Sequence, residues 1–239
     1  MNRRSFIAAS AFGLGLPLAT RSAVADALEQ HRGPVAESDP ATSGPDLSAN
    51  QIVTHVEAFY DKIVTFKASF EQRVALELPN KNRDVGGSVF FEQPGKMSWR
   101  YTCSGNRVVS DGQRIQIYQR ESKQLFDQGF EMSEYPAALS FLIAHGQLEQ
   151  TFELSKFSSN SLNLARTHTL LGVPRHRSTA YARLLFYVDV RTYEVRRVLV
   201  IDAYGNRNRF DFFRSTLNPR IPLNEFAFSA PLGTQIIRL

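Results

Sequence analysis

The sequence predicts a mainly β protein of the α+β class, built on one strongly curved antiparallel sheet. Two observations predict this fold. From residue 70 onward, apolar and polar residues alternate in short segments separated by turn residues, which is typical of half-buried strands. Helical periodicity appears in only two places and does not alternate with the strands, which excludes a parallel α/β fold. We expect about ten strands in up-and-down order.

The first element expected is a helix over residues 48–65. Ser48 is suited to its N-cap, and Gln51 three residues later would complete a capping box. Apolar residues at steps of three and four define its buried face, namely Ile52, Val56, Phe59, Ile63 and Phe66.

A meander of strands follows this helix. Residues 70–78, 85–93 and 97–103 are expected to be strands, with turns at 79–82 and at Pro94-Gly95. Cys103 would share the packed face of the third strand. Asp111-Gly112 lies between apolar segments at 108–109 and 115–118 and predicts a tight hairpin, and residues 125–126 form another short strand.

A second helix is expected to interrupt the sheet. Pro136 suits the first turn, and residues 137–146 are good helix formers up to Gly146. Its apolar residues are few for a permanent core element, which favours a movable lid. Strands are then expected at 151–157, 161–167, 181–190, 195–202, 208–215 and 225–228, with a hairpin turn at 204–206.

The N-terminus has the layout of an export signal. A charged start with Arg3-Arg4 precedes an apolar stretch and a small-x-small cleavage site at Ala23-Val24-Ala25. The twin-arginine type fits best, and an ordinary Sec signal is the alternative. We therefore expect a cleaved signal at 1–25, a flexible linker at 26–48 and one domain at 49–239, soluble in the periplasm.

Composition excludes several classes of protein. The net charge is +5, but three of the arginines lie in the expected signal, so the mature chain lacks the basic excess of a nucleic-acid binder. One Cys excludes an internal disulfide and multi-Cys metal sites, and five scattered His make no metal site. Residues 160–239 hold twelve Arg and five acidic residues, which indicates either solvated outer strand faces or a basic surface for anionic lipid or an acidic partner.

No arrangement of residues predicts catalysis. His176 lies between Arg175 and Arg177, and no carboxylate nearby would orient it. Asp111 is explained by its hairpin turn, and Asp202 and Asp211 are expected to point outward from strands. We expect neither an enzyme nor a cofactor.

Bulky apolar residues share one face of the predicted sheet. Since two helices cover little of it, this face is either an ordinary core or the wall of a cavity suited to an acyl chain. Its members are Phe70, Val89, Phe91, Met97, Trp99, Tyr101, Ile115 and Ile117.

Four stretches together resemble the periplasmic outer-membrane lipoprotein carrier family, LolA. They are Phe66-Lys67-Ala68-Ser69-Phe70-Glu71-Gln72, the segment 87–101 with its Gln93-Pro94-Gly95-Lys96-Met97-Ser98-Trp99-Arg100-Tyr101 run, Val109-Ser110-Asp111-Gly112 with Ile117-Tyr118, and Asp202-Ala203-Tyr204-Gly205-Asn206 with Phe226-Ala227-Phe228 and Pro231-Leu232-Gly233. Order and spacing agree over residues 50–237.

The resemblance implies an incomplete, unclosed β-barrel whose concave face is covered by helices. It also implies a monomeric chaperone that takes lipoprotein acyl chains from an inner-membrane ABC transporter and delivers them to the outer membrane, where a receptor accepts them. A binding or sensing module for another amphiphile, such as a glycolipid, is the alternative. The acyl-chain site and lid would comprise the eight residues of the apolar face together with Phe66, Gln93, Leu139, Leu142 and Ile143. Gln93 departs from the family, which often places a lid-pinning Arg before this Pro.

Overall fold

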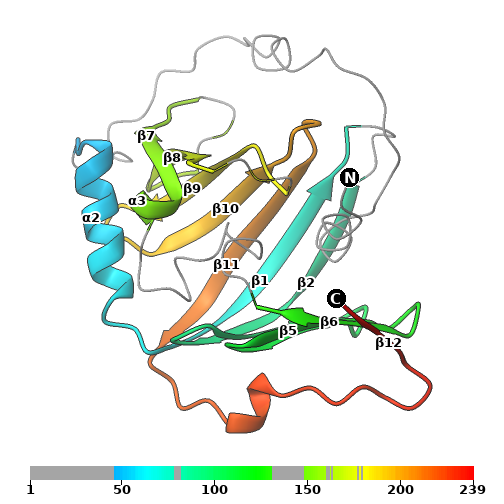
Figure 1. Cartoon of the computed structure of the whole chain (residues 1–239). Coiled ribbons are helices and arrows are strands. Elements are labelled where there is room, and N and C mark those ends of the chain that lie inside the picture. The colour runs from blue at the N-terminus through cyan, green and yellow to red at the C-terminus, as the bar shows by residue number, and fades with distance from the viewer. Residues whose placement is uncertain are drawn as a thin grey trace.

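A computed structural model describes residues 46–77, 82–130, 148–159, 162, 164–176, 178 and 180–239 (Figure 1). The described residues form one twelve-stranded sheet in the order β12-β6-β5-β4-β3-β2-β1-β11-β10-β9-β8-β7. The first six strands are β1 (Thr65–Ala75), β2 (Asn82–Glu92), β3 (Lys96–Tyr101), β4 (Arg107–Asp111), β5 (Arg114–Gln119) and β6 (Gln124–Gly129). The others are β7 (Phe152–Lys156), β8 (Thr167–Pro174), β9 (Arg183–Asp189), β10 (Val195–Ile201), β11 (Arg207–Leu217) and β12 (Gln235–Arg238).

The sheet consists of two meanders joined side by side. The first runs from β1 to β6, and the second runs from β7 to β11 and returns to pair β11 with β1 along its length. Every neighbouring pair is antiparallel except β12 with β6. In the described part of the chain β7 and β12 are the two edges and do not pair with each other, so the curved sheet stays open. The predicted fold class, an unclosed barrel-like sheet, is confirmed.

Helix α2 (Ala49–Tyr60) begins as the sequence predicts. The Ser48 backbone N–H donates to Gln51 Oε1 at 2.8 Å, and the Gln51 N–H donates to Ser48 Oγ at 3.3 Å, which completes the capping box. The predicted end at residue 65 is wrong, because the helix stops at Tyr60. Ile63, Val64 and Thr65 are β-branched and favour extended backbone. Phe66 then pairs on both sides within the sheet.

Helix α2 closes one side of the core. Its buried residues Ile52, Val53, Val56 and Tyr60 belong to the same hydrophobic cluster as the inner face of the sheet. The Tyr60 hydroxyl accepts a hydrogen bond from the backbone N–H of Val195 at 3.1 Å, which ties the end of the helix to β10. Figure 1 shows α2 beside the short helix α3 (Leu148–Thr151) and β7. The predicted helix at 137–146 lies outside the described residues.

The hairpins are placed as the turn residues predict. Gly112 has a φ of +96°, and Asp111 Oδ1 accepts from the backbone N–H groups of Gln113 and Arg114 at 2.8 and 2.9 Å. The turn after β10 is shaped by Asp202, whose Oδ1 accepts from two backbone N–H groups. Asp202 is therefore a turn residue, and its predicted outward position on a strand is wrong.

Three other predictions about strands are wrong. Residues 164–166 form no strand, and β8 lies immediately after them. The apolar residues that suggested a strand there, Leu162 and Leu164, instead pack on a small outer cluster around Leu185, Tyr187 and Leu199. Residues 225–228 are not a strand, because the 3-10 helix η4 (Leu223–Phe226) occupies this segment. Strand β12 was not predicted, and of β8 only its first residue, Thr167, was predicted to lie in a strand.

The third correction concerns the end of β3. The alternation of residues 97–103 predicted that Cys103 would pack with Trp99 and Tyr101. The strand ends at Tyr101, a turn follows, and Cys103 is exposed. The alternation of apolar and polar residues therefore continues past the end of the strand into a turn, where it does not predict which side chains are buried.

The segment between β11 and β12 crosses the outer face of the first meander. Glu225 on η4 is buried and accepts hydrogen bonds from Ser98 Oγ at 2.7 Å and Arg100 Nε at 2.8 Å. Arg107 lies 3.6 Å from the same carboxylate. Because these partners come from β3 and β4, the carboxylate fixes the C-terminal segment on the outer side of the sheet (Figure 1). None of the described helices has the length and apolar character needed to cross a lipid bilayer.

We predict that Gly87→Ala destabilises the protein by about 2 kcal/mol through overpacking. Gly87 lies in β2 opposite Tyr101, and a Cβ there would approach the carbonyl oxygen of Arg100 to 1.8 Å and a ring carbon of Phe70 to 3.1 Å. The matched control is Gly129→Ala at the end of β6, where a Cβ meets nothing within 4 Å. Urea unfolding measures both variants, and equal midpoints would contradict the close packing at Gly87.

Candidate functional site

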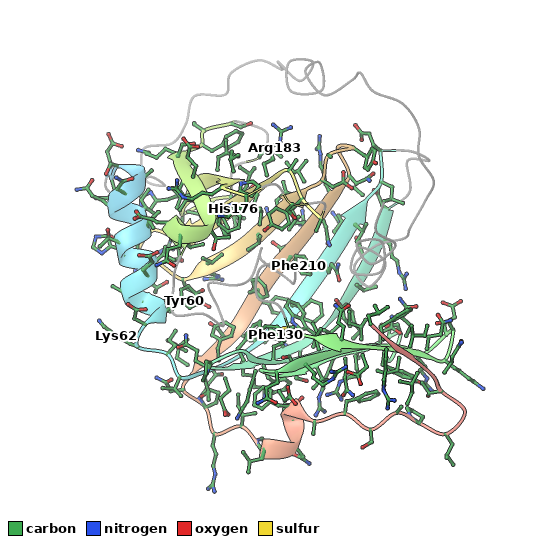
Figure 2. The ribbon with its side chains drawn as sticks, in the orientation of Figure 1. Tyr60, Lys62, Phe130, His176, Arg183 and Phe210 are labelled. Carbon is green, nitrogen blue, oxygen red and sulfur yellow. The ribbon has the colours of Figure 1, made fainter. Side chains whose placement is uncertain are left out.

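The inner face of the curved sheet carries a continuous apolar lining, and we call this surface the inner face throughout. Period-two alternation places every second side chain of each strand on this side. The lining extends over both meanders and includes α2. Figure 2 shows Tyr60, Phe130 and Phe210 on the side that the curved sheet encloses, although they come from α2, the residue after β6 and β11.

The structure brings nine of the predicted site residues together in one buried cluster. Each is at most 7% exposed. They are Phe66, Phe70, Val89, Phe91, Met97, Trp99, Tyr101, Ile115 and Ile117. Gln93 is half-buried at the end of β2 and lies outside that cluster of buried residues. The other three predicted residues, Leu139, Leu142 and Ile143, lie outside the described part of the chain.

Trp99 is the centre of the aromatic packing on the inner face. Its ring centroid lies 4.8 Å from Phe70 and 6.0 Å from Phe91, both in edge-on geometry. Phe210 and Phe212 approach the same indole from β11 at 5.6 and 6.2 Å. Such edge-on and tilted contacts add to the stabilisation from area burial alone. The indole therefore joins side chains from both meanders.

Sequence analysis missed the contribution of the second meander. Phe210 and Phe212 were placed in a strand but were not assigned to the site, although both are buried against Trp99. Their alternation with Asp211 was the available signal, since it puts two aromatic rings on one face and the charge on the other. Phe152 and Phe186, whose rings lie 5.5 Å apart, extend the aromatic lining further toward β7.

A few polar groups interrupt this apolar surface. Gln72 is 3% exposed and donates from Nε2 to Asn208 Oδ1 at 2.9 Å, which pairs the two amides across β1 and β11. The hydroxyl of Tyr101 is buried and has no hydrogen-bond partner among the described residues. Burial raises the pKa of this phenol well above its usual value, so it stays a protonated donor. The Nε2 of Gln93 is also buried without a hydrogen-bond partner among the described residues.

The remaining candidates for chemistry are far from this face. Among the described residues no three His, Cys, Asp or Glu side chains are close enough together to hold a metal ion. His176 is exposed in the loop after β8. Asp211 forms ion pairs with Arg197 and Arg209 on the outer face, so its predicted outward direction is confirmed. The Asp211 carboxylate therefore links Arg197 of β10 and Arg209 of β11 on the outer face.

Two hollows open at the margins of the molecule. One of about 380 Å³ lies beside the free end of β2 and is lined by Arg83, Asp84, Val85, Cys103, Ser104, Asn106 and Glu121. The other, of about 210 Å³, lies between α2 and the turn that joins β9 to β10. Neither is lined by Trp99 or by the rings that pack on it, and these rings belong to one buried cluster.

Comparison with known families gives one match that covers most of the chain. The family model described as "Outer membrane lipoprotein carrier protein LolA" matches residues 61–229. An outer-membrane lipoprotein carrier protein from Methylibium petroleiphilum is 27% identical over 186 residues, which cover 76% of this chain and 87% of the relative. The carrier protein of the same description from Bordetella avium is 24% identical over 201 residues, which cover 84% of this chain and 91% of the relative.

Two solved structures superpose on most of this chain. A LolA superfamily protein from Nitrosomonas europaea superposes with a TM-score of 0.45 at 13% identity, covering 76% of this chain and 98% of that one. A conserved protein from Thermus thermophilus superposes with a TM-score of 0.49 at 12% identity, covering 80% of this chain and 98% of that one.

We predict that Gln93→Leu leaves the stability of the purified protein unchanged or raises it by about 1 kcal/mol, because it removes a buried donor that has no partner among the described residues. The control is Gln72→Leu, which strips a buried hydrogen bond from Asn208 and should cost about 1–2 kcal/mol. Urea unfolding compares the two. A Gln93 variant destabilised as much as the Gln72 variant would show that the Gln93 amide is hydrogen-bonded.

Proposed function

Since the chain belongs to the LolA family of outer-membrane lipoprotein carriers, we propose that it is a periplasmic carrier that binds lipoprotein acyl chains against its inner face. The observation that supports this proposal is the continuous apolar lining of an open sheet. It spans both meanders and is centred on Trp99. A surface of this kind suits a ligand made of methylene groups.

The energetics of such binding suit a carrier. Each methylene that leaves water contributes about 0.8 kcal/mol, so a single acyl chain supplies enough free energy for stable binding. The aromatic rings that receive it pack on one another when no cargo is present. Loading therefore exchanges ring–ring contacts for ring–chain contacts, and the net free energy stays small enough for the cargo to be released again.

In this proposal, the protein carries lipoproteins from the inner membrane to the outer membrane. Residues 1–25 would direct export and residues 26–48 would form a linker before the carrier domain at 49–239. An inner-membrane ABC transporter would load the acyl chains, and a receptor in the outer membrane would accept them. Energy for release from the inner membrane would come from the transporter, so the carrier itself catalyses no reaction.

Gln93 and the segment 136–146 keep their proposed part in lid control. A charged guanidinium at position 93, as the family often has, would bind a carbonyl of the lid more strongly than a neutral amide could. With a neutral residue at position 93, we expect the lid to open more easily and the protein to exchange its cargo faster.

The first test of the proposal uses Trp99, which is the only tryptophan of the chain. We predict that a triacylated peptide changes the intensity or wavelength of the Trp99 emission, because an acyl chain would contact the indole in place of Phe70 or Phe210. The same peptide without acyl groups is the control and should leave the emission unchanged. Calorimetric binding without any change in emission would place the acyl chains away from Trp99.

A second test measures the transport step itself. We predict that the purified protein releases mature lipoproteins from spheroplasts, and that protein already loaded with the triacylated peptide releases far less. Mass spectrometry of lipid extracted from the released complexes should find lipoprotein acyl chains. Failure to release lipoproteins, together with co-purification of a glycolipid or another amphiphile, would assign the fold to a different lipid and contradict the carrier proposal.

A further inference from the structure

Tyr101 is the polar exception within the aromatic cluster. Its ring packs edge-on against Phe70 at 5.3 Å, and the residue is 7% exposed. Its hydroxyl nevertheless has no hydrogen-bond partner within the described residues. Buried hydroxyl groups in native proteins are normally hydrogen-bonded, so an unpaired one points to a partner that is absent from the isolated chain.

The position of Tyr101 marks one end of the apolar lining. It is the last residue of β3, whereas β2 continues past it to Asn82 and there pairs only with β1. Arg83 lies on this extension opposite Val74, which puts it on the inner side of the sheet. Arg83 is exposed, and no acidic side chain of the described chain forms an ion pair with it.

The charge of Arg83 also reaches Tyr101. It counteracts part of the rise that burial causes in the pKa of the Tyr101 phenol. The 380 Å³ hollow begins at this point, lined by Arg83 and Val85 and, further along, by the acidic residues Asp84 and Glu121. Asp84 is ion-paired with Arg73. The apolar lining thus ends at the buried hydroxyl of Tyr101. Next to it lie Arg83, which has no ion-pair partner among the described residues, and the open hollow.

We propose that the Tyr101 hydroxyl donates a hydrogen bond to the ester carbonyl of a bound acyl chain, with the polar head of the lipid leaving the sheet beside Arg83. This inference rests on the proposed function, since it concerns how the carried lipid is oriented. The acyl chain would lie from Tyr101 past Trp99 toward Met97, a length of about 13 Å along the strand. The peptide of the lipoprotein would then continue into the hollow.

The donors at this end of the face define the ligand chemistry. A protonated phenol and a guanidinium both offer N–H or O–H groups, and the guanidinium cannot accept. The matching ligand group is therefore an acceptor oxygen, either the ester carbonyl of an acylated peptide or the carboxylate of a free fatty acid. A cationic head such as an alkylammonium would be disfavoured by the charge of Arg83.

The experiment compares two ligands on two proteins. A synthetic peptide carrying an ester-linked diacylglyceryl cysteine is measured against its ether-linked analogue, which has the same chains without the carbonyls. We expect the unmodified protein to bind the ester about five-fold more tightly, the size typical of one neutral hydrogen bond. Tyr101→Phe should bind both ligands equally, while its urea midpoint stays at or above that of the unmodified protein.

Tyr118→Phe is the matched control. Tyr118 is also 7% exposed, but it lies on the outer face, with its ring 5.2 Å from Phe228. This variant should keep the preference for the ester. Arg83→Gln should raise the affinity for a dodecylammonium probe relative to dodecanoate, because it removes the positive charge at this end of the face.

The outcomes distinguish the proposed hydrogen bond of Tyr101 from the carrier function on which it rests. If Tyr101→Phe keeps the five-fold preference, the hydroxyl does not contact the carbonyl, although acyl binding and the carrier function stand. If the variant loses affinity for free palmitate but not for the ester-linked peptide, the acceptor is a fatty-acid carboxylate and the ester assignment is overturned. If the unmodified protein binds neither acylated peptide, the carrier function fails and this inference fails with it.

Discussion

The packing of Trp99 on rings from β11 is the contact on which the shape of the sheet depends. Between β3 and β11 lie two other strands, so in a flat sheet the two would be about 14 Å apart. The centroids of Trp99 and Phe210 are nevertheless 5.6 Å apart. Strong curvature of the sheet brings the two strands closer together on the inner side, and the large aromatic side chains span the remaining distance. The same contact joins the two meanders. Within the described sheet, their backbones are hydrogen-bonded to each other where β1 pairs with β11.

The outer face is organised by charge, which complements the apolar inner face. Asp211 holds Arg197 and Arg209 beside it, and Glu225 fixes the C-terminal segment across β3 and β4. The arginine excess of residues 160–239 is thus partly explained by ion pairs on the outer strand faces. Because these interactions all lie on the side away from Trp99, the outer face can hold the curved sheet in place whatever occupies the inner face.

Sequence reasoning succeeded where a segment's own pattern decides its structure and failed where distant segments decide it. Alternation located most strands of both meanders, and Ser48 with Gln51 located the start of α2. The end of α2 was misplaced because Phe66 fits a helical stripe as well as a strand. Leu162 and Leu164 alternate like a strand but pack on an outer cluster, and Cys103 continues an alternation whose strand has already ended. Nine of the predicted site residues pack in one cluster. The rings of β11 were not assigned to it, since they reach Trp99 through the curvature of the sheet, which no local pattern encodes.

A surface that is both core and binding site must be stable when empty and must still orient its cargo. Aromatic rings meet the first requirement, because they pack on one another and keep their shape. They cannot meet the second, since methylene groups slide along apolar surface with little preference for direction. Orientation needs a polar group at one end that the protein leaves unpaired. Gln72 does not serve, because Asn208 already binds its amide. Gln93 Nε2 is without a partner among the described residues, but Gln93 lies outside the aromatic cluster. The Tyr101 hydroxyl lies within the cluster, at the end where the apolar lining stops and Arg83 begins the polar surface. In the proposed carrier, the asymmetry between this end and the apolar surface around Trp99 would give an amphiphile one favourable direction in which to lie.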